Sequence, residues 1–250
     1  MFSKLQLVSL LTLVAILTSY VHSEEVELPS YIHVCHKSNP ELEKCFKDAI
    51  DNLKDHLATG IEEIDVPGID PLYIGQLNLL SQDLAGFVLK TKDVYAYEAG
   101  NFQINDLRYS NYLNCNNYFP RVRVEGIYNI DGRFLTFPIK GQGKFNANFS
   151  HITADVKLEM EIKPDNEEKN RYTITDIIIK ANVERGKVKL YDLFGGDRIL
   201  GNIVNNALNQ NFDEVGKDLL PIVEKALAEK LKAIGNKILI QFTYEQLLPD

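Results

Sequence analysis

The stretch ILGNIVNNALNQNFDEVGKDLLPIVEKALAEKLKAIGNKILIQF, residues 199–242, decides the fold. Apolar residues recur in it every three or four positions, which is the period of an amphipathic helix. One continuous helix of 44 residues would be about 66 Å long, whereas a spherical domain of this size is only about 45 Å across. The sequence therefore predicts an elongated molecule, with bends or breaks in the helix at Gly216 and Pro221.

The residues before this helix alternate as β-strands do. In ADVKLEMEIK, residues 154–163, apolar side chains occupy every second position and charged ones lie between them. From Leu72 to about Tyr191 the pattern predicts strands of eight to a dozen residues, separated by turns. Turns are expected at Asp131-Gly132, Pro164 to Asn170 and Arg185-Gly186. Because no segment between them could form a crossover helix, the sheet is predicted to be antiparallel.

Shorter signals mark the two ends of this sheet. Ser38 and Glu41 stand in a capping-box arrangement, so a first helix is expected to begin near Asn39 and to stop at Gly60. Asp197 is the expected N-cap of the long helix. The predicted fold class is α+β: one elongated domain with a long kinked C-terminal helix wrapped by a highly curved antiparallel β-sheet.

The first 23 residues have the composition of a secretory signal peptide. Lys4 precedes an apolar core, and Val21-His22-Ser23 is a small-residue cleavage site, which leaves residues 24–250 as the mature domain. A membrane anchor is the alternative, but the apolar run is short and carries polar residues. The formal net charge is −8, and removal of Lys4 with the leader makes it −9. Such an acidic chain is a poor candidate for binding nucleic acid or anionic membranes.

Three cysteines lie in the mature chain. Export permits disulfides, and the short loop between Cys35 and Cys45 predicts that these two are bonded. Cys115 is then left over, as a quiet thiol, although intermolecular pairing remains an alternative. Asn148-Phe149-Ser150 is a sequon for N-glycosylation, with Asn148 on the outward side of its strand.

Catalytic motifs are absent from the sequence, and a metal site is disfavoured. There is no nucleophile elbow, zinc-protease motif, phosphate loop or dinucleotide fingerprint. His33 and His36 flank Cys35, and with Cys45 they could form a zinc site, but exported cysteines favour a disulfide. The sequence thus indicates no enzyme, no metal and no cofactor.

The order of the N-terminal features resembles the insect takeout and haemolymph juvenile hormone-binding protein family. It comprises Leu28-Pro29, two cysteines with nine residues between them, a short helix, the segment Val66-Pro67-Gly68-Ile69-Asp70-Pro71-Leu72 and the ending Phe242-Thr243-Tyr244-Glu245. The resemblance covers essentially the whole mature chain. It implies a tubular lipid-binding fold with an internal apolar tunnel and a carrier of juvenile hormone-like terpenoids, fatty acids or other lipids.

The residues expected to face the helix are the ligand-binding candidates. Periodicity alone favours core packing over ligand contact for each of them, whereas the family resemblance implies ligand contact for the group as a whole. Tyr128 stands out because its hydroxyl could orient the polar end of an apolar ligand. The full set is Phe87, Leu89, Phe102, Ile104, Val122, Val124, Tyr128, Phe145, Ala147, Phe149, Val156, Leu158, Met160, Ile174, Ile203 and Leu208.

Two functions fit these observations. The first is a secreted, monomeric carrier in haemolymph or another extracellular fluid, whose partner is a hydrophobic small molecule or lipid. The alternative is a secreted interaction or signalling protein, with a core filled by its own side chains and an outer face that meets an unknown receptor.

Overall fold

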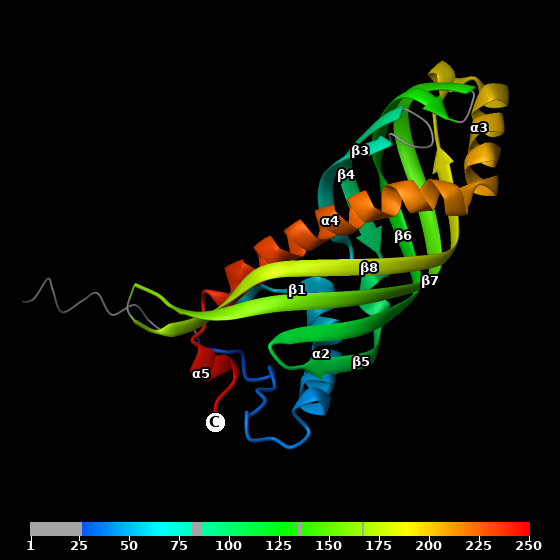
Figure 1. Cartoon of the computed structure of the whole chain (residues 1–250). Helices are drawn as coiled ribbons and strands as arrows, with labels where there is room; N and C mark the ends of the chain where they lie inside the picture. Colours follow the sequence, from blue (N-terminus) through cyan, green and yellow to red (C-terminus); the bar gives the residue numbers. More distant parts are fainter. Residues whose placement is uncertain (1–26, 82–86, 135–136, 167) are drawn as a thin grey trace, which may run out of the picture.

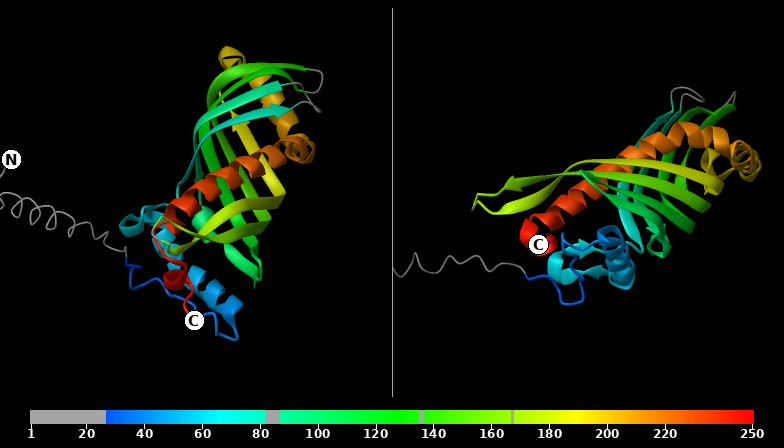
Figure 2. Two further views of the ribbon diagram at one scale, coloured as in Figure 1. Left: turned by 60° about the vertical axis from the view of Figure 1, so that its left-hand side comes forward. Right: turned by 60° about the horizontal axis from the view of Figure 1, so that its bottom comes forward.

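A strongly curved antiparallel sheet is the framework of the molecule (Figures 1 and 2). The computed structural model describes residues 27–81, 87–134, 137–166 and 168–250, so the predicted leader lies outside the described residues. The order of the main strands is β3-β4-β6-β7-β8, and β5 pairs with the first part of β6. The strands are β3 (Leu72–Ser81), β4 (Phe87–Tyr97), β5 (Gln103–Tyr109), β6 (Tyr112–Phe134), β7 (Phe137–Pro164) and β8 (Asn170–Leu190).

The last three strands are 23, 28 and 21 residues long, about twice the predicted length. Two predicted turns are therefore wrong, because Asp131-Gly132 lies within β6 and Arg185-Gly186 lies within β8. Both glycines instead occupy positions inside a strand where a side chain would be unfavourable. Gly132 has a φ of 143°, and a Cβ on Gly186 would lie 2.1 Å from the ring of Phe212. The third turn is confirmed by the pairing of Pro164 with Asn170.

In all three long strands, the set of alternate positions that faces inward switches at one row of residues. Pro120, His151 and Glu184 are skipped in the ladders that join β6 to β7 and β7 to β8, and His151 has a left-handed φ of 53°. In β7 the less exposed side chains are Phe145, Ala147 and Phe149 before this row, and even-numbered residues such as Ala154 after it. Figure 1 shows β7 and β8 bending between the part beside α3 (Arg198–Gln210) and the part beside α4 (Phe212–Leu239).

The predicted long helix is two helices, α3 and α4, with the break at Asn211. Gly216 and Pro221 do not break the helix, because both lie inside α4. One missing hydrogen bond at a proline does not end a helix that is packed against a sheet along its length. α4, about 42 Å long, packs against β8 and also against β3, the two outer strands of the sheet. It thereby closes the open side of the curved sheet, as the α+β fold class predicts (Figure 2).

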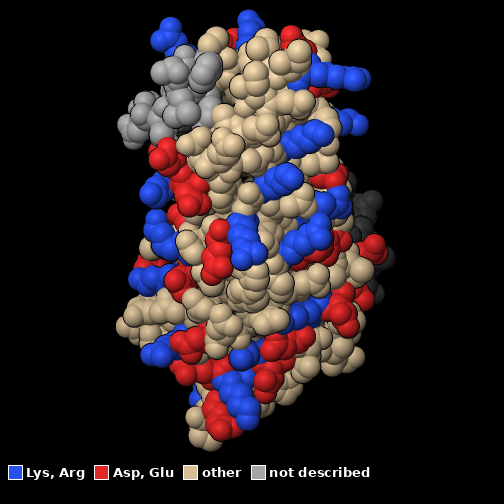
Figure 3. All heavy atoms as spheres, turned by 90° about the vertical axis from the view of Figure 1, so that its right-hand side faces the viewer, with Lys and Arg blue, Asp and Glu red and all other residues tan. Residues whose placement is uncertain are grey.

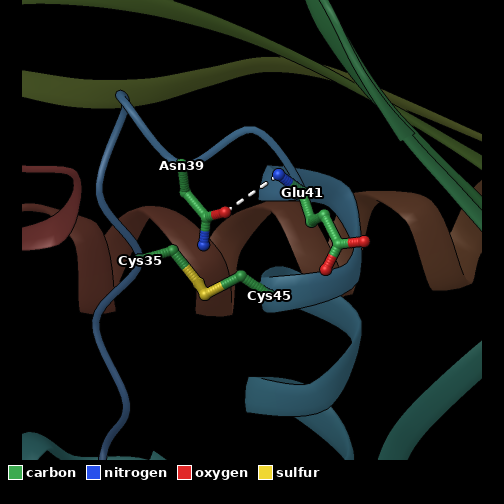
Figure 4. Close-up of a disulfide and its surroundings, with 4 residues drawn as sticks. All are labelled: Cys35, Asn39, Glu41 and Cys45. Carbon is green, nitrogen blue, oxygen red and sulfur yellow. Dashed lines mark hydrogen bonds between the residues drawn. A yellow bond between two sulfur atoms is a disulfide. The ribbon is translucent and has the colours of Figure 1, made fainter.

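The N-terminal arm is fixed to α2 (Leu42–Thr59) by the predicted disulfide, with an S–S distance of 2.03 Å between Cys35 and Cys45 (Figure 4). The predicted capping box at Ser38 is wrong, since α2 begins three residues later than expected. Asn39 Oδ1 instead accepts a hydrogen bond from the backbone N–H of Glu41, 2.9 Å away (Figure 4). This local turn keeps the chain out of the helix until Leu42.

The predicted stop and the second cap are confirmed. Gly60 ends α2 with a φ of 98°. Asp197 caps α3 by accepting hydrogen bonds from the N–H groups of Ile199 and Leu200. The remaining elements are β1 (Gly60–Ile61), β2 (Val66–Pro67), η1 (Glu62–Ile64), η2 (Ala99–Asn101), η3 (Phe194–Gly196) and α5 (Tyr244–Leu247). Across the described ranges, no helix combines the length and the apolar character needed to span a bilayer.

Candidate functional site

The inner face of the sheet, the face that packs against α2, α3 and α4, is the candidate site. Two apolar clusters occupy it. The first lies at the α3 end and contains Tyr128, Ile130, Ile139, Leu190, Leu193 and Val204. The second lies beneath α4 and contains Ile174, Ile177, Ile179 and Ala228.

Many apolar side chains on this face are only half-buried, although they face the helices. Val124 is one example: it pairs with buried Ala147 in the neighbouring strand, yet remains half-exposed. Phe149 is another, with its ring 6.1 Å from that of Phe212 at the start of α4. Apolar groups that face inward and still touch solvent-accessible space are typical of a wall that a ligand can cover.

The structure brings most of the predicted set onto this face. The half-buried members are Leu89, Phe102, Val122, Val124, Phe145, Phe149, Val156, Leu158, Met160 and Leu208. The buried members are Ile104, Tyr128, Ala147 and Ile174. Phe87 belongs to β4, but its side chain lies outside the described part of the chain.

Ile203 does not face the sheet. Its side chain is 52% exposed, and Val204 is the buried residue of this turn. The reason is the rotation of α3, which Asn205 and Asn209 set by binding the edge of β8. With those two side chains on the strand, Val204 points inward and Ile203 points outward.

Phe102 and Ile104 contact a different helix from the one expected. Phe102 lies with its ring 4.7 Å from Lys54 Nζ of α2 and 6.0 Å from the ring of Phe119. Ile104 lines an open pocket together with α2 residues, including Lys47 and Lys54. Both residues thus belong to the part of the inner face that α2 covers, and not to the part beneath α4.

The hydroxyl of Tyr128 is hydrogen-bonded inside the protein. The hydroxyl donates a 2.5 Å hydrogen bond to the backbone carbonyl of Tyr191, just after β8. Burial, helped by the nearby charge of Asp192, raises the pKa of Tyr128 to about 12. The side chain is therefore neutral at physiological pH, and its hydroxyl proton is donated to the Tyr191 carbonyl and not to a ligand.

Cys115 lies on the inner face, which the sequence did not indicate. It pairs with Leu107 of β5 and with Val156 of β7, so the three side chains share one side of the sheet. Burial is the main cause that raises the pKa of Cys115 to about 11, and Asp106 adds to it. The alternation of Leu113 and Cys115 with Asn114 and Asn116 in β6 is the signal that could have found it.

We expect Cys115 to react slowly with thiol reagents in the folded protein. Only the thiolate reacts, and raising the pKa from 9.0 to about 11 lowers the thiolate fraction about 100-fold at neutral pH. Iodoacetamide labelling followed by mass spectrometry checks this, with urea-unfolded protein as the reference. Equal labelling rates in the two states would contradict it.

The outer edge of β8 is hydrogen-bonded by side chains of the helices. β8 has no strand on its second side in the described sheet. Asparagine carboxamides there accept from the backbone N–H and donate to the C=O of a single strand residue, as a neighbouring strand would. The pairs are Asn205 with Leu190 (2.8 and 2.9 Å), Asn209 with Val188 (2.7 and 2.8 Å) and Asn236 with Ile174 (2.7 and 3.0 Å).

Glu224 completes this edge from the middle of α4. The residue is 7% exposed, and its carboxylate accepts a 2.7 Å hydrogen bond from the N–H of Ala181. Polar residues at these positions interrupt the apolar pattern of 199–242 at helical spacing. That interruption was a signal for the edge contacts, which sequence reasoning missed.

Two further features considered from the sequence are the zinc group, which was disfavoured, and the predicted glycosylation site. His33, Cys35 and Cys45 have ligand atoms within 4.8 Å of one another, but the two sulfurs are joined to each other and offer no thiolate. Asn148 is exposed on the outer face, where its Oδ1 accepts a hydrogen bond from Arg121 at 3.1 Å. Its glycosylation stays a prediction.

Comparison with known proteins identifies relatives along most of the chain. Residues 10–249 match the family described as haemolymph juvenile hormone binding protein (JHBP). The circadian clock-controlled protein daywake of Drosophila melanogaster is 22% identical over 198 residues, which cover 75% of this chain and 76% of the relative. Its counterpart from Drosophila yakuba is 21% identical over the same length and the same shares of both chains.

A solved structure shares the fold. The crystal structure of Epiphyas postvittana Takeout 1 matches with a TM-score of 0.74 at 19% identity, covering 83% of this chain and 96% of that chain. At this level of identity the likeness shows a common architecture of curled sheet and C-terminal helices.

Proposed function

The chain belongs to the haemolymph juvenile hormone binding protein (JHBP) family, and from this premise we propose that it is a secreted carrier of one hydrophobic small molecule. The cargo is a juvenile hormone-like terpenoid, a fatty acid or another lipid, held in an apolar tunnel between the curved sheet and α4. The family is one of binding proteins, and we propose no catalytic activity. The family description, with its haemolymph source, supports an extracellular location.

One observation carries the proposal: inward-facing apolar side chains stay half-buried between the two buried clusters. Val122, Val124 and Phe149 have this property near the bend of the sheet, and Val156 and Leu158 have it beneath α4. Covering about 300 Å² of apolar ligand surface there would contribute roughly 7 kcal/mol before association costs. Binding at micromolar concentration or tighter therefore needs no covalent bond.

Dye displacement on delipidated protein tests the carrier function. We expect an environment-sensitive apolar dye to bind at one molecule per chain and to be displaced by long-chain fatty acids or terpenoids. Because the contacts are apolar, added salt should change the affinity little. Native mass spectrometry of the protein as purified should also detect a bound lipid.

The alternative, an interaction protein with a self-filled core, has support at the α3 end. There Tyr128, Ile139 and Leu193 are almost fully buried by their neighbours. A folded, delipidated sample with no saturable dye binding, and a purified protein that carries no lipid, would favour this alternative over the carrier.

A further inference from the structure

Charge is unevenly distributed on this acidic protein. The convex outer face of the sheet, at its α3 end, carries many basic residues that alternate with the inward-facing ones along four strands. We call this set the basic face. It consists of Lys90 and Lys92 of β4, Arg121, Arg123 and Arg133 of β6, Lys140 and Lys144 of β7, and Arg185, Lys187 and Lys189 of β8.

Few acidic residues balance it. Three of its ten basic residues are paired with carboxylates: Arg121 with Glu98, Arg123 with Glu125 and Lys140 with Asp131. Within the described part of the chain, no carboxylate forms an ion pair with Lys144, Lys187 or Lys189. The chain as a whole has a net charge of −8, but basic residues outnumber acidic ones on this face.

α3 lies along the edge of β8, where Asn205 and Asn209 bind Leu190 and Val188, and it exposes aliphatic side chains next to the basic face. Ile199, Leu200 and Ile203 in the first turns of α3 are 75%, 46% and 52% exposed. Ile199 and Ile203 are four residues apart and share one side of the helix, which is rotated away from the buried side that contains Val204. Figure 3, which faces the α3 end, shows Lys and Arg side chains in a row beside an uncharged surface.

We propose that α3 and the basic face dock the protein onto anionic lipid membranes. Exposed aliphatic residues can enter the boundary between headgroups and acyl chains, while lysines beside them attract anionic headgroups. A soluble polyanion would engage the lysines but leave Ile199 and Ile203 in water. The net charge of the whole chain disfavours such membranes, but attraction to a surface depends on the face presented to it, since charges beyond a Debye length of about 8 Å are screened.

This inference goes beyond the proposed function and does not depend on the cargo. Docking at a membrane would let an apolar molecule leave or enter the protein without crossing bulk water. The contact is peripheral, which agrees with the lack of a membrane-spanning helix among the described residues.

Co-sedimentation with vesicles tests the docking. We expect the full-length mature protein to bind phosphatidylserine–phosphatidylcholine vesicles at low ionic strength, and to bind pure phosphatidylcholine vesicles much less. Lys144→Gln, Lys187→Gln and Lys189→Gln should each lower the partition coefficient about fivefold. Ile199→Ser with Ile203→Ser should lower it by a similar factor or more. Lys225→Gln, with the same loss of charge at an exposed position of α4, is the matched control and should change nothing.

Three outcomes would overturn the proposal. They are no binding of the unaltered protein to anionic vesicles, equal binding to neutral vesicles, and a loss of binding in the lysine variants without any loss in the isoleucine variant. The last result would indicate a site for soluble polyanions or an acidic protein. Circular dichroism and melting curves of each variant ensure that the comparison is made between folded proteins, and the dye assay remains a separate test of the carrier function.

Discussion

Replacing Asn205 and Asn209 together by alanine is expected to destabilise the protein severely. The double variant loses four hydrogen bonds to β8, at 2.7 to 2.9 Å. A hydrogen bond contributes about 0.5–1.5 kcal/mol net, so the free energy of unfolding should fall by about 2–6 kcal/mol. At roughly 2–4 °C per kcal/mol, the melting temperature should drop by about 10 °C. Urea and thermal denaturation followed by circular dichroism measure both quantities.

The same variant should also self-associate. Without the two carboxamides, the N–H and C=O groups of Val188 and Leu190 are free on the strand edge, and free edges pair with other chains. Asn206→Ala is the matched control, because Asn206 lies between the two on α3 with an exposed side chain. A double variant that melts like this control and stays monomeric would show that the helix contacts do not stabilise the edge.

Ala147→Trp is expected to abolish ligand binding while the fold survives. Ala147 is 2% exposed on the inner face, and its cross-strand partners are Val124 and Val188. In a solid core the indole would overpack its neighbours and cost about 1–3 kcal/mol or more. Next to a tunnel it can enter ligand space, so the melting temperature should stay within a few degrees. Dye affinity should then fall by at least tenfold.

The control for this variant is the next residue along the strand. Asn148 points to the outer face, so Asn148→Gln should remove any glycan and leave dye binding unchanged. An Ala147→Trp protein that unfolds, or one that folds and binds normally, would mean that this part of the inner face is not ligand space.

The sequence predicted the architecture because periodicity reports which side of an element is buried. The alternation in 154–163 and the helical period of 199–242 were sufficient for a curved sheet closed by helices. The family resemblance was correct on separate grounds, since it rested on local motifs such as Cys35 and Cys45, which fix the N-terminal arm.

Local signals misled where tertiary contacts compete with them. Gly186 looks like a turn residue, but it provides space for the ring of Phe212 inside a strand. Pro221 looks like a helix breaker, but the helix breaks at Asn211, where Phe212 packs toward Phe149. Neither partner is near in sequence, so no window of neighbouring residues could have revealed the contact.

The residues that line the inner face of the sheet could be predicted only as a group. Inward direction follows from alternation, which was correct for Phe145, Ala147 and Phe149. The rotation of α3 does not follow from it, since that depends on asparagines binding a distant strand, and Ile203 was therefore misplaced. Which helix covers Phe102 likewise depends on the path of the N-terminal arm.

The row of Pro120, His151 and Glu184 has a consequence for how the length of this chain can vary. The ladders on both sides of the row keep one register, while the buried positions change from odd to even along β7. Deleting one residue from a single strand would therefore turn half of it inside out relative to its neighbours. Insertions and deletions in the sheet must be matched in adjacent strands at that row or fall at the hairpin ends. The long strands are thus inherited as a unit of fixed length, and size can change freely only where they turn.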